Sequence, residues 1–412
     1  MKRAASILSV VSVVVGAAGS LAAQSPFEKP PALKAAELVP PALLSGPGYR
    51  VADSVPTTGL LGEFRLEAPS GTFDVHGLDL LRIRVAELAA IDELDRTSKT
   101  AEFAKAAARA VARPVTSASN MLMHPVDTVA GVPASVERFF DRMKLGGASI
   151  GKAASRNGAG AAAARLGSVT IDVLGFEEER RHLAKRLDVD PYTTNPVLAE
   201  KLTDVAWVSF SARQAITVAS AAVVPYAMGM STVSLTNNLI WDVKPADVLA
   251  LDEKKLKAMG ATDPQARALI ETPHYSITVL TSLVSGLERL DAVAGRPEVI
   301  ALAATVTNED QARFLMGAVQ MLAHHHQWVG RLAEVRARGT VIGKTAASDV
   351  VVGAPVDYVS WTERVATFAR RADFKESSPS LWLTGRMSTR ARQEFEQLGW
   401  RVHEGSPTAS DN

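Results

Sequence analysis

The chain has 412 residues, of which 47% are apolar and 22% are charged, and its formal net charge is +1. These values are typical of a folded protein with about two or three domains, and a near-neutral charge gives no electrostatic reason to expect nucleic-acid binding. The chain has no cysteine, which excludes disulfide bonds and a lipid attached to a cysteine. Its stability must therefore come from packing.

The first 23 residues have the three parts of a secretory signal peptide. Lys2 and Arg3 give a positive start, an apolar run follows from 4 to 15, and small residues lead to a cleavage site after Ala22 or Ala23. The apolar run is about 12 residues long, which is short of the roughly 20 that a membrane-spanning helix needs. We therefore predict a bacterial protein that is periplasmic or secreted.

The first part of the expected mature chain changes character near residue 59. Residues 24–58 are rich in proline and have no helical or strand period, so we interpret them as an extended, partly ordered arm that acts as a spacer. Two runs that alternate between apolar and polar residues then predict a β-hairpin over 62–76. Apolar residues at helical spacing from Leu81 to Leu94 predict a helix packed on this hairpin.

The middle of the chain is predicted to be mainly helical. Asp263, which precedes a proline, is expected to cap one helix, and Thr307 with Asp310 resembles the capping box of another. The second of these helices is expected to run to about Arg338. Residues 146–167 are rich in glycine and alanine and are expected to form a mobile loop. Further helices are expected at 101–113, from 133, at 176–187 and after the turn at 190–196.

Strands and helices alternate from about residue 340. Ser388 is expected to cap a helix that Gly399 ends, and this helix lies between two predicted strands, which implies a right-handed parallel crossover. Ala391, Phe395 and Leu398 are expected to face inward on it. The predicted strands of this part are at 341–342, 350–352, 381–383 and 400–403, with a further helix at 361–371.

The fold class that these elements predict is α+β, with a mainly helical middle, an N-terminal β-hairpin and a small C-terminal α/β unit. We find no internal repeat. The predicted division is a signal peptide at 1–23, a proline-rich arm at 24–58, a mainly helical domain with the hairpin at 59–338, the α/β unit at 339–404 and a disordered tail at 405–412.

Two short motifs imitate catalytic loops. Gly147–Gly151 matches the nucleophile-elbow pattern around Ser149, but a charged helix is predicted before it where the chemistry needs a strand. Gly339–Thr345 imitates a phosphate loop with one residue too few between its glycines. We interpret the first as a chance match and the second as a β-turn.

Three consecutive histidines, His324–His326, have the chemistry of a metal site. Adjacent residues on a helix point about 100° apart, so three in a row do not converge on one ion. Two Glu-x-x-His pairs begin at Glu179 and Glu271 and resemble part of a di-iron site, but Pro273 interrupts the second and charged residues surround the first. We expect neither a metal nor a cofactor.

Residues 214–241 contain no charged side chain, which is unusual in this chain. Pro225 divides the run, and polar residues become frequent after Met230, whereas a membrane span is apolar for about 20 residues. The pattern favours a buried, broken helix pair. Membrane association through residues 205–241 remains as an alternative.

The strongest candidate ligand site lies between a predicted strand and a predicted helix. Ligands of open α/β sheets bind at the carboxyl ends of strands, where helix-end amides, Gly385, Arg386 and the Ser388 hydroxyl would together hold an anion. The alternative is a capping turn with a surface arginine.

Three hypotheses of function follow. The first is an exported, cysteine-free protein that binds or scaffolds in the cell envelope, with an envelope protein or a small anionic ligand as its partner. The second is an exported hydrolase built on Ser149 or on His324–His326. The third is a membrane-associated protein that uses residues 205–241.

Overall fold

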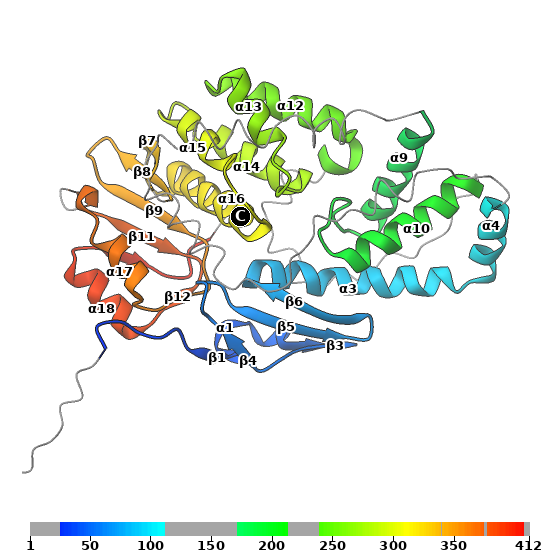
Figure 1. Ribbon diagram of the computed structural model, residues 1–412, viewed down its shortest axis with the longest axis horizontal. Coiled ribbons are helices and arrows are strands. Elements are labelled where there is room, and N and C mark those ends of the chain that lie inside the picture. The colour runs from blue at the N-terminus through cyan, green and yellow to red at the C-terminus, as the bar shows by residue number, and fades with distance from the viewer. Residues whose placement is uncertain (1–24, 112–170, 213–238, 339, 375–376, 408–412) are drawn as a thin grey trace, which may run out of the picture.

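A computed structural model describes residues 25–111, 171–212, 239–338, 340–374 and 377–407 (Figure 1). Several predicted features lie outside the described residues. They are the signal peptide, Ser149, the helix from residue 133 and most of 214–241. Within the described residues, no helix is both long and apolar enough to span a bilayer. The fold is α+β, as predicted, with antiparallel strands at the N-terminal side, a helical middle and a C-terminal sheet.

The N-terminal sheet has four antiparallel strands in the order β2-β3-β5-β6. The predicted hairpin is confirmed, and its Phe64, Leu66 and Val75 are buried because alternate side chains share one face. Helix α3 (Leu78–Ser98) packs against the hairpin. The apolar residues at helical spacing that predicted this helix, from Leu81 to Leu94, are buried in the same core. The strands are β2 (Ser45–Gly46), β3 (Tyr49–Val51), β5 (Glu63–Ala68) and β6 (Gly71–His76).

The segment expected to be an extended spacer belongs to this core, so that prediction is wrong. Val39, Leu43 and Val55 are buried among the side chains of α3 and the hairpin. Proline is compatible with this structure because a helix start needs no donor at its first residue, and Pro41 occupies that position. The elements are too short to show a period: β1 (Ala32–Lys34), α1 (Ala35–Leu38), α2 (Pro41–Leu44) and β4 (Ser54–Pro56).

The helical middle forms two groups (Figure 1). Helices α9 and α10 pack with α3 and α4, and helices α12 to α16 surround a separate apolar core. The described helices are α4 (Ala101–Val111), α9 (Ile171–Arg186), α10 (Pro196–Ala212), α12 (Pro245–Ala258), α13 (Asp263–Ile270), α14 (Ile277–Arg289), α15 (Arg296–Ala303) and α16 (Glu309–His324).

Two of the predicted helix starts are wrong by one residue, and one helix is much shorter than expected. Thr262 caps α13 and Asn308 caps α16, each by accepting a hydrogen bond from a backbone N–H of the first turn. The helix expected to reach Arg338 ends at His324 and is followed by a π-helical turn, after which Gly330 is extended. The rest of that range is strand β7 (Leu332–Ala337).

The C-terminal sheet has five strands in the order β13-β11-β9-β8-β7. Strands β9, β11 and β13 are parallel, and helix α18 (Thr389–Gln397) lies between β11 and β13 in the chain, which confirms that the two predicted strands are parallel neighbours joined through a helix. Helix α16 lies on one face of the sheet, while α17 (Glu363–Ala369) and α18 cover the other (Figure 1). The remaining strands are β8 (Val341–Thr345), β9 (Val350–Ala354), β11 (Ser380–Leu383), β13 (Arg401–His403) and the short parallel pair β10 (Tyr358–Val359) and β12 (Arg386–Met387).

Helix α18 packs on the sheet through two of its three predicted inward residues. Ala391 and Phe395 are buried, and the Phe395 ring contacts the rings of Trp361 and Trp400. Leu398 is 40% exposed, so its predicted inward orientation is wrong. The helix ends at Gln397, and Leu398 is the residue after its last turn.

Candidate functional site

A cleft of about 420 Å³ lies where three parallel strands end. Asp357 follows β9, residues 384–386 follow β11, and residues 404–405 follow β13, and all of them line the cleft. Ligands of open α/β sheets bind at this edge because the loops after the strands converge there. The opposite wall is formed by α1 and the first turns of α3, through Glu37, Leu38, Leu78, Asp79 and Arg82.

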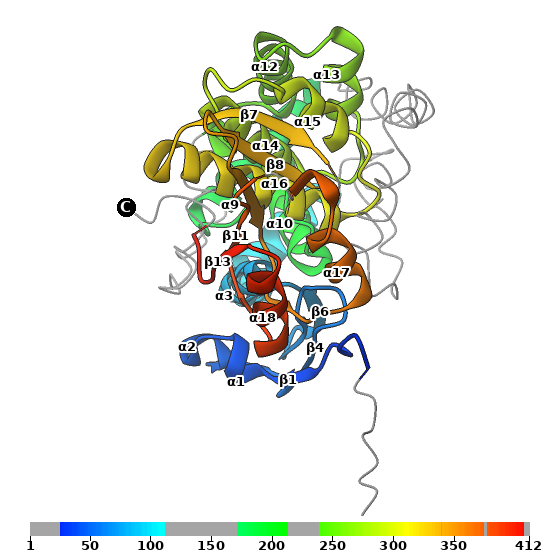
Figure 2. The same ribbon diagram turned by 90° about the vertical axis from the view of Figure 1, so that its left-hand side faces the viewer.

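The structure places two of the three predicted site residues in this cleft. Gly385 and Arg386 line it, whereas Ser388 does not. The Ser388 hydroxyl donates to the Glu28 carboxylate at 2.6 Å and accepts from the Ala391 N–H at 3.0 Å. Ser388 therefore caps α18, as predicted, and its hydrogen bond to Glu28 joins the N-terminal segment to the start of α18. In Figure 2, α18 lies just above β1 and the N-terminal segment that leads into it.

Gly385 has a packing reason to be glycine. A Cβ atom at this position would lie 2.1 Å from the carbonyl oxygen of Asp357. The chain after β11 must therefore pass directly against the chain after β9, which fixes the inner wall of the cleft. Its neighbour Arg386 donates to the Glu37 carbonyl, and its guanidinium lies 3.9 Å from the Glu37 carboxylate.

Asp357 is the most unusual group of the cleft. Its residue is 8% exposed, and its Oδ2 atom accepts hydrogen bonds from the N–H groups of Gly62 at 2.7 Å and Leu78 at 3.1 Å. The described residues place no cationic side chain within 4.0 Å of its oxygens. Burial raises the pKa of Asp357 to about 7, although the two backbone N–H groups favour its charged form.

The charges of the cleft are unequal. Four carboxyl groups and two guanidinium groups line it. Asp79 and Arg82 pair at 3.0 Å, and Glu404 pairs at 2.5 Å with Arg392, which lies outside the lining. The cleft therefore carries an excess of negative charge whenever Asp357 is ionised.

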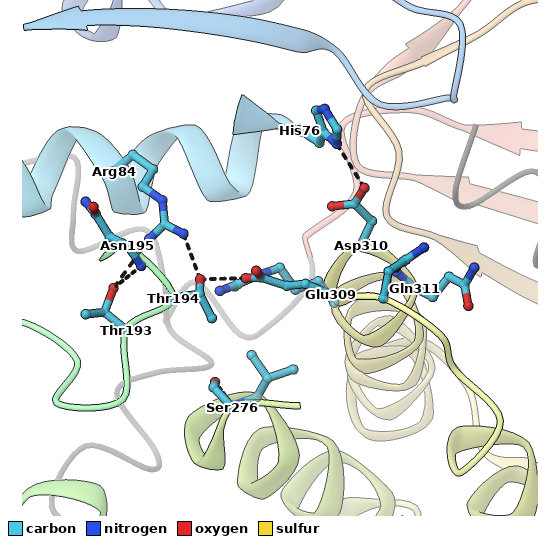
Figure 3. Close-up of polar contacts among 12 residues, drawn as sticks. His76, Arg84, Thr193, Thr194, Asn195, Ser276, Glu309, Asp310 and Gln311 are labelled. Carbon is cyan, nitrogen blue, oxygen red and sulfur yellow. Dashed lines mark hydrogen bonds and ion pairs between the residues drawn. The ribbon is translucent and has the colours of Figure 1, made fainter. Parts of the chain in front are cut away.

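A second polar cluster is buried between α3, the turn at 190–195 and the start of α16 (Figure 3). The Glu87 carboxylate accepts from Arg84 at 2.9 Å, from Asn195 at 2.9 Å and from the Thr193 hydroxyl. Thr194 lies between two charges, since its hydroxyl accepts from Arg84 at 2.7 Å and donates to Glu309 at 2.7 Å. We call these residues the buried polar network.

The network extends to α14 and to the hairpin. Asp190 accepts from the Thr278 hydroxyl at 2.7 Å and from the Tyr192 N–H at 2.8 Å, and burial raises the pKa of Asp190. His76 points toward Asp310 at 2.9 Å (Figure 3), and this hydrogen bond raises the pKa of His76. Buried charges held in this way fix how the elements meet.

Two of the three histidines, His325 and His326, have a structural role in the π-helical turn, and His324 is the last residue of α16. His325 Nδ1 contacts the Gly330 carbonyl oxygen at 3.1 Å, and His326 Nδ1 accepts from the Leu332 N–H at 3.0 Å. In the Glu-x-x-His pair on α9, Glu179 accepts from the Ser209 hydroxyl at 2.8 Å. Across the described ranges, no three His, Asp or Glu side chains lie close enough together to hold a metal ion.

Sequence reasoning found the strand edge but missed Asp357 and the N-terminal wall of the cleft. Two apolar strands followed by polar residues were the available signal for the edge. No family model, curated protein sequence or solved structure matches this chain, so its function has to be inferred from its own geometry.

Proposed function

We propose that this protein is a binding protein of the cell envelope and that a small organic ligand occupies the cleft at the ends of β9, β11 and β13. The observation that carries the proposal is that all three parallel strands end in residues of one cleft. The predicted signal peptide supports the location in the envelope.

The lining supports binding rather than nucleophilic catalysis. The described residues of the cleft include no serine or histidine, and the hydroxyl of Thr384 already donates to the Val356 carbonyl at 2.9 Å. A nucleophilic hydroxyl needs a base within hydrogen-bond reach. Of the two hydrolase candidates, Ser149 lies outside the described residues, and the three histidines are not among the residues that line the cleft.

The absence of cysteine allows a direct test. Thr384→Cys places a single thiol in the cleft, and Thr367→Cys places one on the exposed side of α17 as a control. We would measure the rate of maleimide labelling of both variants with millimolar cationic, neutral and anionic organic probes. The expected result is that at least one class of probe slows labelling of Thr384→Cys about threefold or more, because bound probe protects the thiol and the labelling rate falls by the factor 1 + [L]/Kd.

The control must keep its labelling rate with every probe. Equal labelling of Thr384→Cys with and without all three classes of probe contradicts a ligand-binding cleft. Protection of both thiols together would indicate a general change of the protein rather than occupation of the cleft, and it contradicts the proposal as well.

A further inference from the structure

We infer that the ligand of this cleft is an organic cation whose ammonium group binds beside the Asp357 carboxyl group and whose apolar part lies on Leu38 and Leu78. This inference rests on the proposed binding function. It names the class of ligand, which the binding proposal leaves open.

The pairing of charges in the cleft favours a cationic ligand. Asp79 has Arg82 as its partner, and Glu404 has Arg392. Asp357 receives only backbone N–H groups from Gly62 and Leu78. A buried carboxylate without a cationic partner attracts a cation strongly, because the interaction is screened less than at the surface. An ammonium group would supply the missing charge and up to three donors.

The positions of the arginines in the cleft disfavour an anionic ligand. The largest charge effects of neighbours on Asp357 come from Asp79 and Arg82, both on α3, and Arg386 is not among them. Arg386 instead faces Glu37. An anion placed at Arg386 would therefore lie next to a carboxylate, and the anionic ligand suggested by the sequence is the less favoured class.

The wall of the cleft that α1 and α3 form has both charged and apolar side chains. Leu38 and Leu78 both line the cleft and are half-buried, so they leave apolar surface for a ligand to cover. Covering such surface is favourable by about 25 cal/mol per Å². A ligand with one ammonium group and a compact apolar body fits this combination better than a small inorganic cation.

The protonation of Asp357 gives the inference a pH dependence. Burial raises its pKa to about 7, so the carboxyl group is mostly ionised at pH 8 and mostly neutral at pH 6. The other charged groups that line the cleft are Glu37, Asp79, Arg82, Arg386 and Glu404. Cation affinity should therefore rise between pH 6 and pH 8.

The test uses three probes with nearly the same apolar body: cyclohexylmethylamine, cyclohexylmethanol and cyclohexanecarboxylate. Their dissociation constants for the purified protein would be measured by NMR titration. At pH 8 the amine is expected to bind about tenfold more tightly than the alcohol, and the carboxylate least. The amine should lose affinity by up to about tenfold at pH 6, whereas the alcohol should not change.

Asp357→Asn tests the residue. The asparagine oxygen can replace Oδ2 and accept from Gly62 and Leu78, so the variant keeps these hydrogen bonds and loses the charge. We expect about tenfold weaker amine binding, no pH dependence and unchanged alcohol binding. Asp349→Asn, at the opposite end of β9, is the matched control and should bind the amine like the unaltered protein.

A second pair of variants does not depend on the folding of Asp357→Asn. Arg386→Ala removes a positive charge from the lining and should strengthen amine binding about twofold. Arg390→Ala should not, although Arg390 also holds a backbone carbonyl of the N-terminal segment. If the alcohol or the carboxylate binds and the amine does not, the cation inference is overturned while the binding function stands. If no probe binds and Thr384→Cys is never protected, both proposals fail.

Discussion

Among the ion pairs that helix α3 carries between residues three apart, two lie in contrasting environments. Asp79 and Arg82 pair at 3.0 Å beside the cleft, and Arg84 and Glu87 pair at 2.9 Å in the buried polar network. The side chains of Asp79 and Arg82 are 56% and 28% exposed. Those of Glu87 and Arg84 are 3% and 9% exposed. The same local pattern thus serves an accessible surface in one turn and a structural junction in the next.

The environment decides what each region can do. In the buried polar network the carboxylate of Glu87 has three protein donors, which leaves little for a ligand to add. In the cleft, Asp357 is also buried but faces a space large enough for a small molecule. Glu87, with three side-chain donors, thus belongs to a structural junction, whereas Asp357, with backbone donors alone, faces a cleft that we propose to hold a ligand.

The largest effect should come from breaking the network at Glu87. Glu87→Ala leaves Arg84 buried without its carboxylate, and we expect a loss of about 5 kcal/mol in the free energy of unfolding. Asp79→Ala removes the exposed pair on the same helix and should cost less than about 1 kcal/mol. Urea unfolding of both variants measures the difference. Similar costs would show that burial does not distinguish the two pairs.

The scaffold of the cleft gives the next effect. Phe395 is 1% exposed under β11 and β13, so Phe395→Ala should cost about 3–5 kcal/mol through the cavity that it leaves. Gln393 is exposed on the other side of α18, and Gln393→Ala should change stability by less than about 0.5 kcal/mol. Thermal unfolding of the two variants is the measurement. A small loss for Phe395→Ala would mean that α18 does not support the strands as described.

The smallest expected effect is the pH dependence of Asp357. Its pKa is about 7 in the fold and about 3.9 when the chain is unfolded, so between these values the folded state holds the extra proton. Stability from this group is therefore greatest at low pH and is lost as pH rises through 7. Between pH 5 and pH 8 the loss is about 2–3 kcal/mol, at roughly 1.4 kcal/mol per unit.

Asp357→Asn removes this dependence. Relative to the unaltered protein, the variant should gain about 2–3 kcal/mol in its free energy of unfolding when the pH rises from 5 to 8. Comparing the two proteins cancels contributions from His76, whose raised pKa stabilises the fold at low pH, and from Asp190, which shifts in the same direction as Asp357. Parallel pH curves for the two proteins would contradict a neutral-range pKa.

The parts of the fold that could be predicted are those with a local period. Alternation predicted the hairpin, helical spacing predicted α3, and strand–helix–strand order predicted the parallel pair of β11 and β13. The N-terminal segment could not be predicted, because elements of two to four residues show no period and its prolines suggested a spacer. Leu398 was misplaced because the helix ends one residue earlier than its apolar pattern.

The site was predictable only in part, for a related reason. Gly385 and Arg386 follow a recognisable strand, and the general preference of ligands for strand ends located them. The Asp357 carboxylate accepts hydrogen bonds from Gly62 and Leu78, which are 295 and 279 residues away in the chain. Such partners leave no trace in local spacing, and the same holds for Glu87 and Asn195, which are 108 residues apart.

The contact between the two ends of the described chain has a consequence for biosynthesis. Arg390 holds the carbonyl groups of Ser25 and Pro26 at 2.8 and 2.7 Å, and Ser388 holds Glu28, across more than 350 residues of sequence. Because translation begins at the N-terminus, the N-terminal segment is made long before α18. This segment includes α1, which forms part of the opposite wall of the cleft, and its contacts with α18 form only after α18 has been made. Long-range closure of this kind is slow and comes late in folding. A chain that stops before α18 has no finished cleft, so a ligand held in the cleft would report that the chain has been made and folded at least as far as Gly405.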